Sequence, residues 1–159
     1  MNLHSAKNAA NPSNSPACVR LLIVGDRPRA RQSLEALFTS LRWNTPDRSE
    51  LQIEIVGEAN DGQQAVAQVE ALNPDVVVMD LPTHDPMGRL FVAGSKLDGL
   101  ATIRTIKVRW PLVRIVMLTL YATDRSAVLL AGADVFLLKG CSTSELLNAM
   151  DEARTSGSP

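Results

Sequence analysis

The chain has 159 residues, of which 45% are hydrophobic and 21% charged, and its formal net charge is −1. This length predicts one domain with a substantial core, and the balanced charge gives no reason to expect a nucleic-acid or membrane partner. Cys18 and Cys141 lack any metal-ligand spacing, so we expect two reduced thiols. No apolar run approaches the roughly 20 residues that span a bilayer. These features predict a cytoplasmic protein.

Both ends of the chain are polar. Residues 1–17 are rich in Asn, Ser, Ala and Pro and contain no apolar segment behind a basic start. This composition predicts a disordered tail and argues against a signal peptide. Residues 156–159 form a second short tail, which leaves 18–155 as the folded domain.

Short apolar runs alternate with segments of helical periodicity throughout residues 18–155. The runs that predict strands span residues 19–24, 51–56, 75–80, 112–118 and 134–138. Helices are predicted to begin near Pro28, Gly62, Asp98, Asp124 and Ser142 or Thr143. Five strands that alternate with helices predict an α/β fold, a doubly wound parallel sheet with helices on both faces. The alternating run at 51–56 suits a half-buried edge strand.

Four chemically distinctive residues follow or end these apolar runs, namely Asp26, Asp80, Thr119 and Lys139. Because the carboxyl ends of parallel strands lie along one edge of a sheet, we expect these side chains to gather there. Two carboxylates can hold Mg²⁺, and an ammonium and a hydroxyl can stabilise the oxygens of an incoming phosphoryl group. Lys139 can also form an ion pair with Asp80 or Asp26. The set predicts an aspartyl-phosphate site at Asp80.

The ordered motifs resemble the receiver domain of two-component response regulators, and most closely receivers that usually precede a LuxR-type helix-turn-helix. The matching segments are residues 19–28, 56–62, 74–80, 118–119 and 132–139. The resemblance covers about residues 19 to 155 and implies a flavodoxin-like sheet of order 2-1-3-4-5. It implies a signalling module and not an enzyme, beyond assistance to its own phosphorylation and dephosphorylation.

Carried over residue by residue, the resemblance makes Asp80 the phosphoacceptor. The metal ligands it implies for Mg²⁺ are Asp26, Asp80 and the backbone carbonyl of Pro82, which proline retains.

Three side chains are implied as phosphoryl contacts or switch residues besides the aspartate. Thr119 corresponds to the hydroxyl that moves toward the phosphoryl group, and Lys139 to its counter-ion. Phe136 occupies the position of an aromatic switch residue, although it lacks the hydroxyl that a tyrosine would bring.

Three features depart from the family pattern. Gly25 stands where the family usually has the first of two adjacent acids, which should weaken Mg²⁺ binding. The connection after Asp80 is about ten residues longer than usual, so we expect an inserted loop at about 82–97 that acts as a lid, docks a partner or is tolerated surface. The region from Tyr121 to Gly132 is shorter than usual around the fourth helix.

The resemblance therefore implies a receiver that accepts a phosphoryl group from a histidine kinase or phosphotransfer protein and switches a protein-interaction face, through a homodimer or an output partner. No DNA-binding segment follows the last helix, so we expect either a stand-alone receiver or part of a longer protein. The alternative is a degenerate receiver that binds proteins independently of phosphorylation, which Gly25, the insertion and the altered fourth-helix region favour.

Overall fold

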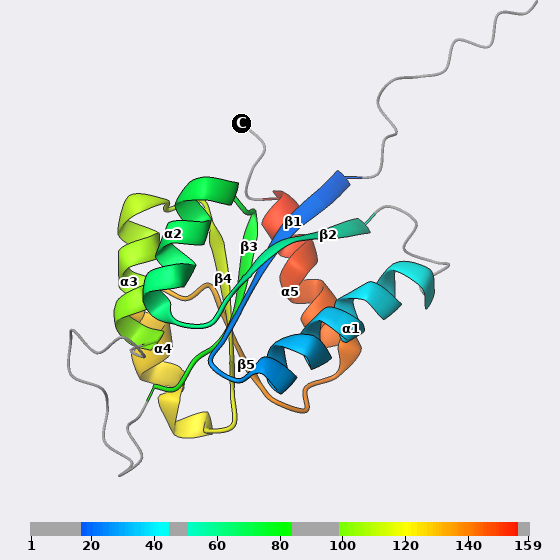
Figure 1. The fold of residues 1–159 in the computed structure, drawn as a ribbon. Coiled ribbons are helices and arrows are strands. Elements are labelled where there is room, and N and C mark those ends of the chain that lie inside the picture. Colours follow the sequence, from blue (N-terminus) through cyan, green and yellow to red (C-terminus); the bar gives the residue numbers. More distant parts are fainter. Residues whose placement is uncertain (1–16, 45–50, 84–98, 156–159) are drawn as a thin grey trace, which may run out of the picture.

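The computed structural model describes residues 17–44, 51–83 and 99–155 (Figure 1). Its strands are β1 (Ala17–Gly25), β2 (Leu51–Ala59), β3 (Val76–Asp80), β4 (Arg114–Thr119) and β5 (Val135–Leu138). Its helices are α1 (Pro28–Asn44), α2 (Gly62–Leu72), α3 (Gly99–Arg109), α4 (Arg125–Ala131) and α5 (Thr143–Thr155), with a short 3-10 turn η1 (Ala122–Asp124) before α4. The expected tails and the expected insertion lie outside the described residues, except that Ala17 belongs to β1 and residues 82 and 83 are described.

The five strands form one parallel sheet in the order β2-β1-β3-β4-β5, which confirms the predicted architecture. β2 lies at one edge, as its alternating pattern predicted. It extends to Ala59, beyond the predicted end at residue 56, because its pairing with β1 continues after a register shift between Leu21 and Leu22. In the centre of the sheet, Gly25 of β1 pairs with Asp80 of β3.

The hydrophobic core has two halves, one on each face of the sheet. Figure 1 shows α1 and α5 on one face and α2, α3 and α4 on the other. Successive side chains of a strand point to opposite faces, so Leu21 and Ile23 pack toward Phe38 of α1 while Leu22 and Val24 join the α2–α4 side. Every residue of β3 is buried. The central strand is therefore rigidly enclosed up to Asp80, its last residue.

At the amino end of the sheet, two aspartates immediately before strands bind the backbone of the neighbouring strand. Asp75 accepts a hydrogen bond from the amide of Arg20 at 2.8 Å and donates its own amide to the Arg20 carbonyl at 2.9 Å. Asp134 makes the same pair of bonds with Ile115, at 2.8 and 3.0 Å. Lys107 of α3 adds an ion pair to Asp134 at 3.0 Å.

The carboxyl ends of the strands lie at the opposite edge, and it is there that β1, β3, β4 and β5 deliver Asp26, Asp80, Thr119 and Lys139. Within the described ranges, no helix combines the length and the apolar character needed to cross a membrane.

Candidate functional site

Asp80 and Lys139 form an ion pair across the end of β4. Asp80 ends β3 and Lys139 follows β5, and β4 lies between these two strands. The Lys139 Nζ atom is 2.7 Å from Oδ1 of Asp80. Only 9% of Asp80 is exposed, whereas about a third of the Lys139 side chain remains accessible. From the sequence, Lys139 could pair with either Asp80 or Asp26. In the structure its partner is Asp80.

The turn after β5 places Lys139 over this edge. The Lys139 amide donates to the carbonyl of Thr119 at 2.8 Å, which extends the β4–β5 pairing by one residue. Gly140 then has a φ of 92°, a left-handed conformation that favours glycine. This reversal lets the Cys141 amide bond back to the carbonyl of Leu138 at 3.0 Å and directs the chain into α5.

Arg31 of α1 lies against Gly25, the position of the missing acid. Its Nη1 atom donates to the Gly25 carbonyl at 2.5 Å, and its Nε atom is 3.2 Å from Oε2 of Glu58. A Cβ atom on Gly25 would lie 3.2 Å from Cγ of Arg31 and 3.8 Å from Cβ of Asp80. A side chain at this position would therefore lie between Arg31 and Asp80. The sequence interpretation did not single out Arg31, because only its place one turn into α1 marks it.

The oxygen donors present suit a hard cation, although they are few. Asp26 follows β1 directly and is partly exposed, and Asp80 supplies a second carboxylate. The Pro82 carbonyl already accepts the Gly99 amide at 3.3 Å, which leaves it one further lone pair. Among the described residues, no three His, Cys, Asp or Glu side chains form a metal-binding group. Two carboxylates, a carbonyl and several waters fit Mg²⁺, which retains much of its hydration in proteins.

Thr119 is held by a buried carboxylate that the sequence interpretation had assigned only to the start of a helix. Its Oγ1 atom donates to Oδ2 of Asp124 at 3.4 Å and accepts the Tyr121 amide at 3.2 Å. The same Oδ2 atom accepts a hydrogen bond from Thr83 at 2.5 Å. Asp124 is 1% exposed, and both threonines are buried. Nothing in the sequence indicated this cluster, because Thr83 and Asp124 are 41 positions apart.

Phe136 is buried in β5 and packs into the core on the α2–α4 side of the sheet. The guanidinium of Arg125 lies 5.8 Å from the centre of its ring, within the range of a cation–π contact. The aromatic side chain is therefore turned inward in this structure.

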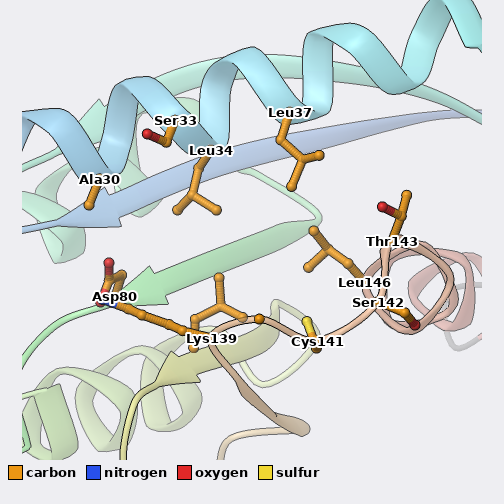
Figure 2. A pocket seen from close by; sticks show the side chains of 12 residues that line it. Ala30, Ser33, Leu34, Leu37, Asp80, Lys139, Cys141, Ser142, Thr143 and Leu146 are labelled. Atoms are coloured by element: carbon orange, nitrogen blue, oxygen red, sulfur yellow. The ribbon is translucent and has the colours of Figure 1, made fainter.

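A pocket of about 280 Å³ opens beside the ion pair. Figure 2 shows α1 on one side of it and the segment 139–143 on the other, with Asp80 and Lys139 at one end. Leu34 and Leu37 of α1 and Leu146 of α5 give it apolar walls. The arrangement joins an apolar recess to a charged group at the sheet edge.

Cys141 lines this recess, and Glu145 lies in the first turn of α5. Burial, and secondarily the charge of Glu145, raise the pKa of the Cys141 thiol. Hydrogen bonds from the amide and the hydroxyl of Ser142, at 2.8 and 2.9 Å, lower the pKa of the Glu145 carboxyl. The Glu145 amide donates back to the Ser142 hydroxyl at 3.2 Å, so Ser142 caps the helix in a capping box.

The five parallel strands have the order of the flavodoxin-like receiver fold. The family model of the response regulator receiver domain matches residues 21–151. The chain therefore belongs to the response regulator receiver family.

Curated relatives agree with this assignment. The response regulator protein VraR of Staphylococcus aureus is 27% identical over 134 residues, which are 83% of this chain and 54% of VraR. The chain thus spans about half the length of the curated relatives it matches.

Solved structures share the fold. The signal receiver domain of NarL from Mycobacterium tuberculosis superposes with a TM-score of 0.66 at 24% identity, covering 87% of this chain and 98% of that domain. A two-component response regulator of the LuxR family from Aurantimonas sp. has a TM-score of 0.60 at 24% identity, covering 86% of this chain and 84% of that one. The predicted resemblance to receiver domains of response regulators is confirmed.

Proposed function

We propose that this chain accepts a phosphoryl group on Asp80 from a histidine of a kinase or phosphotransfer protein. The observation that carries the proposal is the ion pair of Asp80 with Lys139, at a buried strand end beside an open pocket. We further propose that residues 18–155 form the receiver unit, with 82–97 inserted after the phosphoacceptor. It acts in the cytoplasm, and its only chemistry is its own phosphorylation and dephosphorylation.

The transfer itself requires little of the protein beyond positioning and charge. A carboxylate oxygen of Asp80 attacks the phosphorus, a P–O bond forms, and the P–N bond to the donor imidazole breaks with its electron pair leaving on nitrogen. The ammonium of Lys139 balances the negative charge on the transferred oxygens. Because that ammonium already lies at the sheet edge, it need not be recruited during the reaction.

Asp26, Asp80 and the Pro82 carbonyl are the groups that would hold Mg²⁺. When bound, the ion neutralises charge on the phosphoryl oxygens and favours the ionised form of the nucleophile. With Gly25 in place of an acid, we propose that its affinity is weaker than a site with three carboxylates would give.

Phosphorylation would act as a switch through Thr119 and Phe136. A phosphoryl group on Asp80 adds acceptor oxygens at the end of the strand next to that of Thr119. The Thr119 hydroxyl then turns to donate to one of them. Phe136 is already turned inward, so we propose that phosphorylation retains this inward position as the β4–α4 region adjusts. The result is a shift between two arrangements of the α4–β5 face, read by an output partner or a second receiver.

The pocket beside α1 suits the phosphodonor. Its apolar walls and its position next to Asp80 would seat an apolar side chain near the donor histidine, while Lys139 remains accessible to the phosphoryl group.

Since the relatives extend well beyond the matched region, we propose that the output of the whole protein lies in residues outside this receiver.

Intact-mass analysis after incubation with acetyl phosphate and Mg²⁺ tests the proposal. We expect a phosphate-sized mass gain that Asp80→Asn abolishes and Asp151→Asn, an exposed acid of α5, retains. A gain that persists in Asp80→Asn would assign the wrong residue. No gain from either acetyl phosphate or a phosphorylated histidine protein would reject the function.

Arg31 specifically favours the second candidate, a degenerate receiver that binds partners without phosphorylation. Its guanidinium donates to the Gly25 carbonyl, in the position of the missing acid, and a positive charge there opposes the binding of Mg²⁺. Calorimetric titration separates the two functions, because a degenerate receiver would bind neither Mg²⁺ nor beryllofluoride, a mimic of the phosphoryl group. Wild-type protein that binds both favours the phosphorylated receiver.

A further inference from the structure

We propose that Asp124 is a positioning residue that holds the Thr119 hydroxyl in the resting state and couples it to Thr83. The inference rests on the proposed function, since it concerns the hydroxyl that would meet the phosphoryl group. Its basis is one oxygen atom, Oδ2 of Asp124, which accepts hydrogen bonds from both threonines.

The two bonds are unequal. Thr83 lies in close hydrogen-bond contact with Oδ2, whereas Thr119 donates to the same atom at 3.4 Å, near the limit of an effective bond. The two donors share the lone pairs of a single oxygen. Thr83 therefore weakens the hold of Asp124 on Thr119, and each bond depends on the other.

Burial makes this arrangement effective. Asp124 is 1% exposed, Thr83 3% and Thr119 6%, so water does not readily replace either bond. The Tyr121 amide fixes the Thr119 oxygen from another side at 3.2 Å. For the Thr119 hydroxyl to donate to a phosphoryl group on Asp80, it must give up Asp124. The carboxylate thus competes with the phosphoryl group for one proton donor.

The network also links two connections. Thr83 lies three residues after Asp80, in the connection between β3 and α3, and Asp124 ends η1 in the connection between β4 and α4. A change in the first connection that withdraws Thr83 would strengthen the bond between Asp124 and Thr119. The phosphoryl affinity of Asp80 is therefore set partly by the position of Thr83.

Two substitutions that should change the affinity for beryllofluoride in opposite directions test the proposal. We would measure beryllofluoride affinity in the presence of Mg²⁺ for the wild type, Asp124→Asn, Thr83→Val and Thr83→Ser. Asp124→Asn weakens the competing acceptor, so affinity should rise about fivefold or more. Thr83→Val removes the closer donor, so Oδ2 accepts more strongly from Thr119 and affinity should fall severalfold. Thr83→Ser restores the hydroxyl and should resemble the wild type.

The Thr83 variant separates hydrogen-bond competition from simple charge. Asp124→Asn also removes a negative charge, which by itself favours an anion, but Thr83→Val leaves that charge in place. If Asp124 were only structural, both substitutions would weaken binding. Changes of the same sign in the two variants, or no change in either, would overturn the proposal.

A second measurement keeps the inference distinct from the proposed function. If the wild type binds no beryllofluoride, the phosphoacceptor function fails, and NMR scalar couplings of the Thr119 side chain decide the inference alone. In unphosphorylated protein we expect one dominant χ1 rotamer in the wild type and in Thr83→Val, and rotamer averaging in Asp124→Asn. Equal scalar couplings in all three proteins would refute the positioning role of Asp124. Thermal unfolding of each variant verifies that it is folded.

Discussion

The ammonium of Lys139 reaches across the end of β4 to lie 2.7 Å from the carboxylate of Asp80. The two residues are brought together only by the strand order, since neither their separation in sequence nor direct strand pairing joins them. Thr119 ends the strand over which Lys139 passes. The Asp80 carboxylate, its counter-charge and the Thr119 hydroxyl thus come from three adjacent strands.

Breaking this ion pair from one side should destabilise the protein. In Lys139→Met the Asp80 carboxylate remains largely buried without its counter-charge, so we expect the free energy of unfolding at pH 7 to fall by about 1–3 kcal/mol. Adding Asp80→Asn to Lys139→Met should recover most of the loss. Urea denaturation of the two single variants and the double variant gives the coupling energy. Strictly additive effects would mean that the pair contributes nothing.

Restoring an acid at Gly25 should strengthen Mg²⁺ binding. The Cβ of a residue there faces Asp80 at 3.8 Å and needs only a small shift of the Arg31 side chain. Gly25→Asp should lower the calorimetric Kd for Mg²⁺ about tenfold, because ligand charge largely sets the affinity of such oxygen sites. Gly25→Ala introduces the same Cβ without charge and is the matched control. Equal affinities in the two variants would contradict the expectation.

The Cys141 thiol should ionise at a higher pH than an unperturbed cysteine. Burial and the nearby Glu145 carboxylate both disfavour the thiolate and raise its pKa, so less thiolate is present at any given pH near neutrality. In a Cys18→Ser background, the midpoint of the pH–rate profile for iodoacetamide alkylation should lie above that of the same protein in urea. Glu145→Gln should lower the midpoint in part. A native midpoint at or below the denatured one would disprove the effect.

The core beneath α3 should be sensitive to truncation. Ile103 is fully buried on the α2–α4 side, and Ile103→Ala should cost about 2–5 kcal/mol through lost burial and the remaining cavity. Leu112 is 85% exposed, so Leu112→Ala should change stability by less than about 0.5 kcal/mol. Chemical denaturation compares the two directly, and similar losses would mean that the core is wrongly placed.

The fold was predictable because hydrophobic patterning is a local property of the sequence. Alternating apolar runs and helical segments were enough to predict the five strands, the five helices and the parallel sheet. The gathering of Asp80, Thr119 and Lys139 at one edge then follows from parallel strand direction alone. Only the ends of elements differed, as where β2 continues to Ala59 through its pairing with β1.

Contacts between loops were not predictable in this way. Asp124 begins a short helix in the sequence, and its burial against Thr83 depends on how two distant connections fold over the sheet edge. Arg31 likewise occupies an ordinary helical position, and its contact with Gly25 becomes meaningful only because a side chain is missing there. Such features come from tertiary packing, for which neither periodicity nor spacing carries a signal.

The paired bonds of Asp75 with Arg20 and of Asp134 with Ile115 have a consequence at the far edge of the sheet. Each aspartate fixes which residue of its strand lies opposite which residue of the neighbouring strand, at the point where the strand begins. A slip of one residue would turn every side chain of a strand to the wrong face. Asp134 therefore sets the β4–β5 alignment that carries Lys139 over the end of β4, and Asp75 sets the β1–β3 alignment that pairs Gly25 with Asp80. Both carboxylates do so from the opposite edge of the sheet.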